Sequence, residues 1–250
     1  MMSEKMVCKK IVIKLGGSFI TDKKIPLTID WNSLEEFTMQ LNKFYKEHGG
    51  VIVIVHGGGS FGHYEVERIK RNNDRIDQLG VSTIQKSMIT LGLAVIDIMI
   101  KNNLPVSLHP AHTICKNEIA ENCNYEPILN DIKNNLIPVT FGDAIFYKEG
   151  KIISGDDLSI IISNIINADC LLFASDVQGI YDENGNVIKT LDRNQNITVI
   201  KNEGFDVTGG ILNKVKKAFK SNANEVRIIQ GKKIYDALVG KDIGTKILNR

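Results

Sequence analysis

Short apolar runs rich in β-branched residues alternate along this chain with longer segments of helical period. The runs occupy residues 11–13, 51–55, 106–108, 137–140, 170–174 and 226–229, and near-continuous apolar runs of this length are typical of strands covered on both faces. Strands separated by helices are joined through crossover connections, which make them parallel. The sequence therefore predicts an α/β fold with a mostly parallel central sheet sandwiched by helices.

Three segments between these runs have the apolar spacing of amphipathic helices. In the first, apolar residues recur every three or four positions between Ser33, which with Glu36 predicts a capping box, and a predicted stop at Gly49-Gly50. The other two span residues 84–98 and 158–166. We expect all three to pack against the sheet.

The length of the chain allows a full core. With 250 residues, 43% of them hydrophobic, it can form one large domain or two closely joined lobes. A hairpin predicted over residues 146–153 is followed by a new series of helix and strand, which puts the predicted seam near residues 154–157. We expect a single domain with an N-terminal lobe of about residues 1–155 and a C-terminal lobe of about residues 156–250.

Charge and cysteine content limit the partners and the compartment. The 31 basic residues nearly cancel the 29 acidic ones, and a formal charge of +2 predicts no broad surface for nucleic acid or membrane. No uninterrupted apolar run reaches the roughly 18 residues of a spanning helix, and residues 1–10 lack the apolar stretch of a signal peptide. The four cysteines form no C-x-x-C pair, which argues against a zinc site or a disulfide framework. A cytoplasmic protein with reduced cysteines is expected.

A glycine-rich turn follows the first predicted strand. The sequence K-L-G-G-S at residues 14–18 puts Lys14 at the carboxyl end of that strand, where open α/β sheets bind ligands. Glycine lets backbone N–H groups approach phosphate oxygens, and the lysine adds positive charge. Taken alone, a tight turn with a solvated lysine explains this motif equally well.

A second glycine-rich stretch, H-G-G-G-S-F-G-H-Y at residues 56–64, follows the second predicted strand. Its glycines fit both G-x-G-x-x-G and the spacing of a Walker A loop. The Walker pattern fails because His63-Tyr64, instead of lysine and serine or threonine, follow the last glycine. The dinucleotide pattern normally follows the first strand and has an acidic residue about 20 residues on, whereas a polar stretch at residues 65–78 intervenes here.

His63 has two interpretations. It is either a structural helix-capping residue or a hydrogen-bond donor to the phosphate of an acceptor, a task that suits a side chain titrating near neutral pH.

The second half of the chain carries three further motifs. S-G-D-D at residues 154–157 precedes a predicted helix, where Asp157 serves either as the N-cap or as a carboxylate that holds two lysines around a triphosphate. S-D-V-Q-G-I-Y at residues 175–181 follows a predicted strand. D-V-T-G-G at residues 206–210 precedes Lys214 by one helical turn, the arrangement of an anion site at a helix N-terminus. Taken singly, a structural turn or a surface lysine accounts for each.

Together and in this order, the motifs resemble the amino acid kinase superfamily over nearly the whole chain. G-G-G-S-F-G-H at residues 57–63 and T-D-K at residues 21–23 are similar to the isopentenyl phosphate kinases, and the fosfomycin kinases share part of this pattern. The resemblance implies the amino acid kinase fold and ATP-dependent phosphorylation of isopentenyl phosphate to isopentenyl diphosphate in isoprenoid precursor synthesis, by an alternative mevalonate route. It also implies Mg²⁺ and a homodimer. A fosfomycin-kinase-like enzyme or another small-molecule kinase of this fold is the alternative.

The resemblance also implies roles for single residues. Lys14 contacts the ATP phosphates, Lys23 stabilises charge on the transferring phosphoryl group, and His63 holds the acceptor phosphate. Asp157 orients the two key lysines, with Asp156 the second choice. The other residues implied to bind ATP are Gly16, Gly17, Ser18, Gly59, Asp176, Gly179, Gly210 and Lys214, and those implied to adjoin the acceptor phosphate are Gly58 and Gly155.

An acceptor phosphate oxygen is already an anionic nucleophile, so such a site needs positive charge and alignment more than a general base. Magnesium would bridge the phosphates with few protein ligands, and no protein metal ligand is predicted. The predicted helix over residues 84–98 and the hairpin supply an apolar surface for the isopentenyl tail, although an ordinary core position explains each side chain equally well. The candidates are Met88, Ile89, Leu93, Ile145 and Ile153.

Two functions of other classes compete with a kinase. The G-x-G-x-x-G match favours an NAD-dependent oxidoreductase, but it leaves Lys14, Lys23 and Lys214 unexplained. A noncatalytic nucleotide-binding sensor stays open because a fold does not determine activity. A missing phosphate-contacting lysine would favour the sensor, and none is missing.

Overall fold

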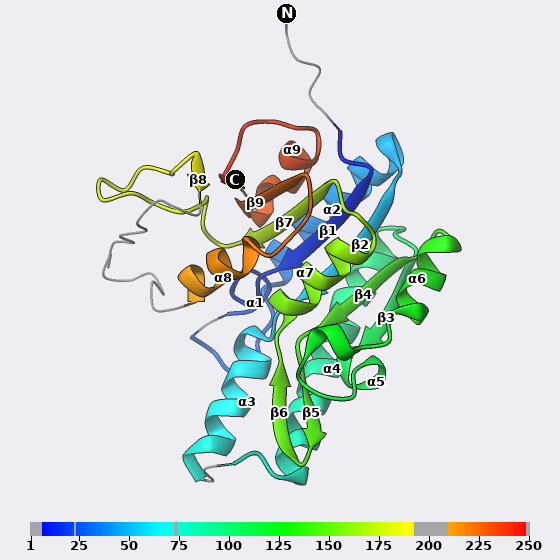
Figure 1. The fold of residues 1–250 in the computed structure, drawn as a ribbon, viewed down its shortest axis with the longest axis vertical. Coiled ribbons are helices and arrows are strands. Elements are labelled where there is room, and N and C mark those ends of the chain that lie inside the picture. The colour runs from blue at the N-terminus through cyan, green and yellow to red at the C-terminus, as the bar shows by residue number, and fades with distance from the viewer. Residues whose placement is uncertain (1–6, 23, 73–74, 193–209, 249–250) are drawn as a thin grey trace, which may run out of the picture.

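The computed structural model describes residues 7–22, 24–72, 75–192 and 210–248. Its main sheet has the strand order β3-β4-β2-β1-β7-β9-β10-β8 (Figure 1). Neighbouring strands pair in parallel, except that β10 is antiparallel to β9. The mostly parallel sheet is confirmed, and each predicted strand forms. The bounds are β1 Lys10–Leu15, β2 Val51–His56, β3 Val106–Pro110, β4 Ile137–Phe141, β7 Cys170–Ser175, β8 Thr190–Asp192, β9 Glu225–Gln230 and β10 Thr245–Leu248.

Helices cover both faces of this sheet, so the predicted sandwich is confirmed. Along β1, Ile11 and Ile13 pack into a core with α2, whereas Val12 between them packs into a second core with α7, because successive strand side chains point to opposite faces. The helices are α1 Gly17–Ile20, α2 Trp31–His48, α3 Gly59–Asn72, α4 Gln78–Lys101, α5 Ala111–Ile114, α6 Glu126–Lys133, α7 Gly155–Ile165, α8 Gly210–Ala218 and α9 Ile234–Leu238, with short 3₁₀ turns η1 Ala120–Asn122 and η2 Gly231–Lys233.

Two predicted helix starts are wrong by a few residues. α2 begins before the predicted capping box, because Asp30 is its N-cap and accepts a hydrogen bond from the Ser33 amide at 3.0 Å. α7 is capped by Ser154, whose hydroxyl accepts from the Asp156 amide at 3.2 Å, so Asp157 lies inside the helix rather than at its N-cap. The predicted stop of α2 at Gly49 is confirmed.

The predicted hairpin forms from β5 Asp143–Tyr147 and β6 Glu149–Ile153. It projects beyond the end of the sheet together with α3 and the first part of α4 (Figure 1). Among the described helices, α4 has the length and composition to cross a membrane. In this fold its residues Ile84, Met88 and Leu91 are buried against the sheet and its neighbours, which accounts for its apolar character as a core helix.

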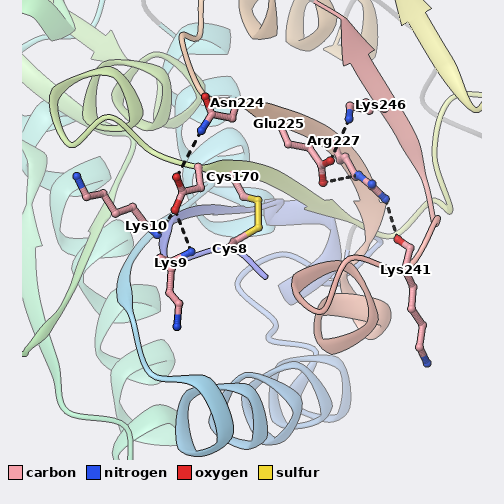
Figure 2. The surroundings of a disulfide bond; sticks show 10 residues. Cys8, Lys9, Lys10, Cys170, Asn224, Glu225, Arg227, Lys241 and Lys246 are labelled. Atoms are coloured by element: carbon pink, nitrogen blue, oxygen red, sulfur yellow. Dashed lines mark hydrogen bonds and ion pairs between the residues drawn. A yellow bond between two sulfur atoms is a disulfide. The ribbon is translucent and has the colours of Figure 1, made fainter. Parts of the chain in front are cut away.

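The expectation of unbonded cysteines is wrong for this structure, which has the disulfides Cys8–Cys170 and Cys115–Cys123. Cys170 lies opposite Ile11 in the β1–β7 pair, so parallel pairing brings the start of the chain beside a cysteine 162 residues away (Figure 2). Spacing along the sequence does not show this adjacency. The cytoplasmic location, which rested partly on reduced cysteines, stays a prediction. The division into two lobes also stays a prediction, and β1 of the first part and β7 of the second belong to one continuous sheet.

Candidate active site

The two glycine-rich turns meet at the carboxyl edge of the sheet. The Gly57 amide donates to the Leu15 carbonyl at 2.8 Å, and the Gly16 amide donates to the Ala174 carbonyl at 2.7 Å. A Cβ atom built on Gly17 would lie 2.1 Å from the Gly59 nitrogen, closer than any side chain tolerates. The turns after β1 and β2 therefore touch backbone to backbone, which explains why glycine stands at these positions.

Gly59 is the most constrained residue of the second turn. Its φ is +47°, and a Cβ there would lie 2.1 Å from Thr21 Oγ1. That hydroxyl already donates to the Gly17 carbonyl at 2.7 Å and accepts from the Ser60 amide at 2.9 Å. The Thr21 side chain thus ties the two turns together through both of its hydrogen-bonding roles.

We predict that Gly59→Ala lowers phosphoryl-transfer kcat/KM by at least about tenfold, because the added methyl separates the two turns and moves the groups that align the reaction. Gly185→Ala is the matched control, since Gly185 has φ +78° and open space around its Cβ position. Both variants bear a backbone strain of about 1 kcal/mol from alanine at positive φ, which corresponds to about 2–4 °C in Tm. Steady-state kinetics and melting curves are compared, and equal kinetic losses in the two variants would contradict the packing argument.

A cluster of two lysines around one carboxylate lies beside these turns. Lys14 Nζ is 3.0 Å from Asp156 Oδ1, and Lys214 Nζ is 3.1 Å from both Asp156 oxygens. Burial alone would raise the pKa of Asp156, but the two ammonium groups outweigh it and hold the pKa well below its usual range. The cluster therefore keeps an ionised carboxylate and a net positive charge, a local anion site in a chain of nearly balanced charge.

The pKa of Lys214 is lowered to about 8, first by burial and second by the charge of Lys14, with Asp156 opposing both. Burial, and after it the charge of Lys14, therefore bring the pKa of Lys214 closer to neutral pH than that of a free lysine. An anionic ligand in the cluster would relieve this repulsion.

The prediction that Asp157 orients the two lysines is corrected: Asp156 contacts both. Asp157 instead accepts from Lys217 Nζ at 2.7 Å, and the same ammonium donates to Ser154 Oγ at 3.2 Å. Consecutive helix residues point about 100° apart, so only one of the two carboxylates can face β1. Sequence reasoning missed Lys217, although its position three residues after Lys214 puts both on one face of a helix.

A cavity of about 260 Å³ opens beside this cluster. Both polar and apolar residues line it, which suits a ligand with an anionic head and an apolar tail. The lining residues other than apolar ones are Lys14, Gly57, Gly58, Gly62, His63, Gly142, Asp143, Ser154, Gly155 and Asp156, and the apolar ones are Val66, Ile84, Met88, Ile152 and Ile153.

The cavity brings together seven of the residues singled out from the sequence, namely Lys14, Gly58, His63, Met88, Ile153, Gly155 and Asp156. His63 lies inside α3, which begins at Gly59, so the helix-capping interpretation of this histidine is wrong. Its side chain is exposed at the cavity wall.

Three predicted tail contacts do not line this cavity. Leu93 is 52% exposed because it lies five residues from Met88, which turns it far around α4 from the cavity. Ile89, next to Met88, is directed away by one helical step and packs only partly against the core. Ile145 packs into the core that contains α7, whereas its neighbour Ala144 packs with Met88, because β5 side chains alternate.

Four of the residues predicted for the nucleotide lie after β7 and in α8, namely Asp176, Gly179, Gly210 and Lys214. Ser18 Oγ donates to Asp176 Oδ1 at 2.9 Å, which joins the turn after β1 to the end of β7. Gly179 packs against Thr245 of β10, where a Cβ would lie 2.8 Å from the hydroxyl. Gly210 begins α8, the helix that carries Lys214. Lys23 lies outside the described residues, and the nucleotide roles stay predictions.

Two polar residues at strand ends escaped sequence analysis. His56, the last residue of β2, is completely buried with its ring centroid 4.7 Å from that of Phe141. Its pKa is lowered to about 4, mainly by burial and also by the charge of Lys14. Asp143, at the start of β5, is buried and paired with His112 Nδ1. Sequence analysis could have found both residues, because each is a polar residue at or just beyond the carboxyl end of a buried strand.

The family model described as the amino acid kinase family matches residues 9–230, and the chain belongs to this family. It is 33% identical to the isopentenyl phosphate kinase of Methanocaldococcus jannaschii, with 94% of this chain and 97% of that protein covered. It is 31% identical to the isopentenyl phosphate kinase of Thermoplasma acidophilum, with 95% and 99% covered. A crystal structure of the T. acidophilum isopentenyl phosphate kinase product complex is similar, with a TM-score of 0.77 at 26% identity over 96% of this chain and all of that one.

Proposed function

We propose that this chain transfers the γ-phosphoryl group of ATP to isopentenyl phosphate and forms isopentenyl diphosphate, a precursor of isoprenoids. The observation that carries the proposal is one cavity lined both by Lys14, His63 and the glycine-rich turn and by apolar side chains such as Met88. A ligand with a phosphate head and a short hydrocarbon tail matches this mixed lining. The near full-length similarity to isopentenyl phosphate kinases supports the same acceptor.

The chemistry follows from charge. The acceptor phosphate oxygen attacks the γ-phosphorus of ATP, the bond to the bridging oxygen breaks, and ADP leaves with that oxygen. Lys14 and Lys214 reduce the repulsion between the two anionic substrates, and Asp156 keeps both ammonium groups at the point of transfer. His63 donates to the acceptor phosphate from the cavity wall. These roles require alignment and positive charge, which the cluster is built to supply.

We also propose that Mg²⁺ binds together with ATP. Among the described residues, no group of three or more His, Cys, Asp or Glu side chains gathers to hold a metal ion, and the Asp156 carboxylate is already occupied by two lysines. Such a site fits an ion held mainly by nucleotide phosphates. Magnesium would then neutralise part of the triphosphate charge, and we assign it no ligand from this chain.

We extend the proposal to a cytoplasmic homodimer. The cytoplasm supplies ATP, which supports the location. Exposed apolar side chains on α4, among them Leu93 and Ile100, support a dimer in which a second copy of the chain covers this surface. Sedimentation of the purified protein distinguishes a dimer from a monomer.

An ATP-consumption assay across acceptors tests the function. The panel contains isopentenyl phosphate, dimethylallyl phosphate, fosfomycin, carbamate, acetylglutamate and UMP, and ³¹P NMR identifies the product. We expect the highest kcat/KM with isopentenyl phosphate and a new diphosphate signal. A higher kcat/KM with fosfomycin would show that fosfomycin, and not isopentenyl phosphate, is the acceptor. ATP binding without turnover of any acceptor would favour a sensor.

A further inference from the structure

His56 lies directly before the second glycine-rich turn and contacts its backbone at the Gly57 carbonyl. In the β1–β2 pair it lies opposite Leu15, whereas Lys14 lies opposite Val55, so the His56 and Lys14 side chains leave the sheet on opposite faces. The imidazole is completely buried and stacks at 35° on Phe141 of β4. The chain then passes directly into Gly57 and Gly58, which line the cavity.

The hydrogen bond of His56 determines its tautomer. Nδ1 lies 3.1 Å from the Gly57 carbonyl oxygen, and a carbonyl oxygen only accepts, so Nδ1 carries the proton. A neutral ring then leaves Nε2 as a bare acceptor, and within the described residues this buried atom has no partner. An apolar side chain would fill the same space without that cost. What His56 adds to the site is therefore the Nδ1–H donor.

This donor sets the direction of the next peptide group. In a trans peptide the Gly57 carbonyl and the Gly58 N–H point to opposite sides. Because the carbonyl is held toward His56, the Gly58 N–H is directed away from His56, and it has no hydrogen-bond acceptor in the part of the chain that the structure describes. The flanking glycines resist a flip of this peptide only weakly. A flipped peptide would turn the carbonyl oxygen toward the acceptor phosphate and repel it.

We propose that His56 is a positioning residue for phosphoryl transfer, whose neutral imidazole holds the Gly57 carbonyl down so that the Gly58 amide faces the acceptor phosphate. This inference rests on the proposed function. His56 acts through the backbone and touches neither substrate. The turn it orients also adjoins the lysine cluster, since a Cβ on Gly57 would lie 3.1 Å from Lys14 Nζ.

Two variants separate positioning from packing. His56→Phe keeps a ring against Phe141 but has no donor, and His56→Asn loses the ring but puts an amide donor near the place of Nδ1. We expect His56→Phe to lower kcat/KM for isopentenyl phosphate by roughly 10- to 100-fold, which corresponds to the loss of the hydrogen bond from the Gly58 amide to the charged phosphate. The Tm of this variant should be unchanged or higher. His56→Asn recovers most of that loss despite a lower Tm. ATP affinity without acceptor changes little in either variant.

NMR supplies a readout that does not depend on turnover. Imidazole ¹⁵N shifts of the wild-type protein are expected to show the neutral Nδ1–H tautomer of His56 at pH 7. With ¹⁵N-glycine labelling, the Gly58 amide signal is expected to move on addition of isopentenyl phosphate or inorganic phosphate, and to move much less in His56→Phe.

The outcomes are distinct. Wild-type protein that fails to phosphorylate isopentenyl phosphate, but whose Gly58 amide responds to inorganic phosphate through His56, would end the proposed function and keep the positioning role. An Nε2–H tautomer, wild-type kcat/KM in His56→Phe, or equal losses in the two variants would overturn the positioning role.

Discussion

Replacing Asp156 with asparagine is expected to lower kcat by about a hundredfold or more, whereas Asp157→Asn changes it by no more than a few-fold. Asp156 is the carboxylate that Lys14 and Lys214 share. The amide cannot balance two ammonium groups in a largely buried site, so the lysines separate or lose a proton and no longer align with the transferring group. Electrostatic contacts made at the transition state are typically worth factors of about 10²–10³ in kcat.

Asp157→Asn is the matched control because it removes one charge from the adjacent residue of the same helix. Its partner Lys217 is partly exposed, and such an ion pair contributes about 0–1 kcal/mol. Steady-state kinetics and melting curves on both variants decide the assignment. If Asp157→Asn causes the larger loss of kcat, the correction from Asp157 to Asp156 is wrong. If neither variant affects kcat, the lysine cluster does not mediate the transfer.

The mostly parallel sheet and the place of the candidate site at its carboxyl edge could be predicted because both depend on local pattern. Apolar runs separated by helices specify a parallel sheet, and the carboxyl ends of parallel strands share one edge. The motif that begins at Lys14 and the one that ends at His63 follow adjacent strands β1 and β2. Both therefore reach the same cavity, although about 50 residues separate them.

Other features depend on angles and distant pairings that spacing does not show. The choice between Asp156 and Asp157 depends on where α7 begins, and its cap at Ser154 lies within the uncertainty of a predicted helix boundary. Leu93 and Met88 both belong to an apolar helix, and only the packing of α4 shows which one meets the cavity. Cys8 and Cys170 meet because β1 pairs with β7. The role of His56 depends on one hydrogen bond to the backbone, which leaves no trace in a pattern of residue types.

His63→Ala is expected to lower kcat/KM for the acceptor by about one to two orders of magnitude, with ATP affinity in the absence of acceptor nearly unchanged. The imidazole lines the cavity, where it can donate to the acceptor phosphate. A hydrogen bond to a charged group contributes roughly 1.5 to 3 kcal/mol, which corresponds to this loss. His63→Gln keeps a hydrogen-bond donor at this position and should recover part of the loss.

Stability provides the internal control for His63. Its side chain is exposed, and exposed substitutions usually change the free energy of unfolding by no more than about 0.5 kcal/mol, so the Tm of both variants should stay near that of the wild type. Acceptor kinetics, calorimetric ATP binding and melting curves are measured on the same preparations. A large fall in Tm, with ATP and acceptor affected alike, would show a structural role. An unchanged acceptor kcat/KM in His63→Ala would remove the histidine from the acceptor phosphate, and with it the residue that most separates this interpretation from other kinases of the fold.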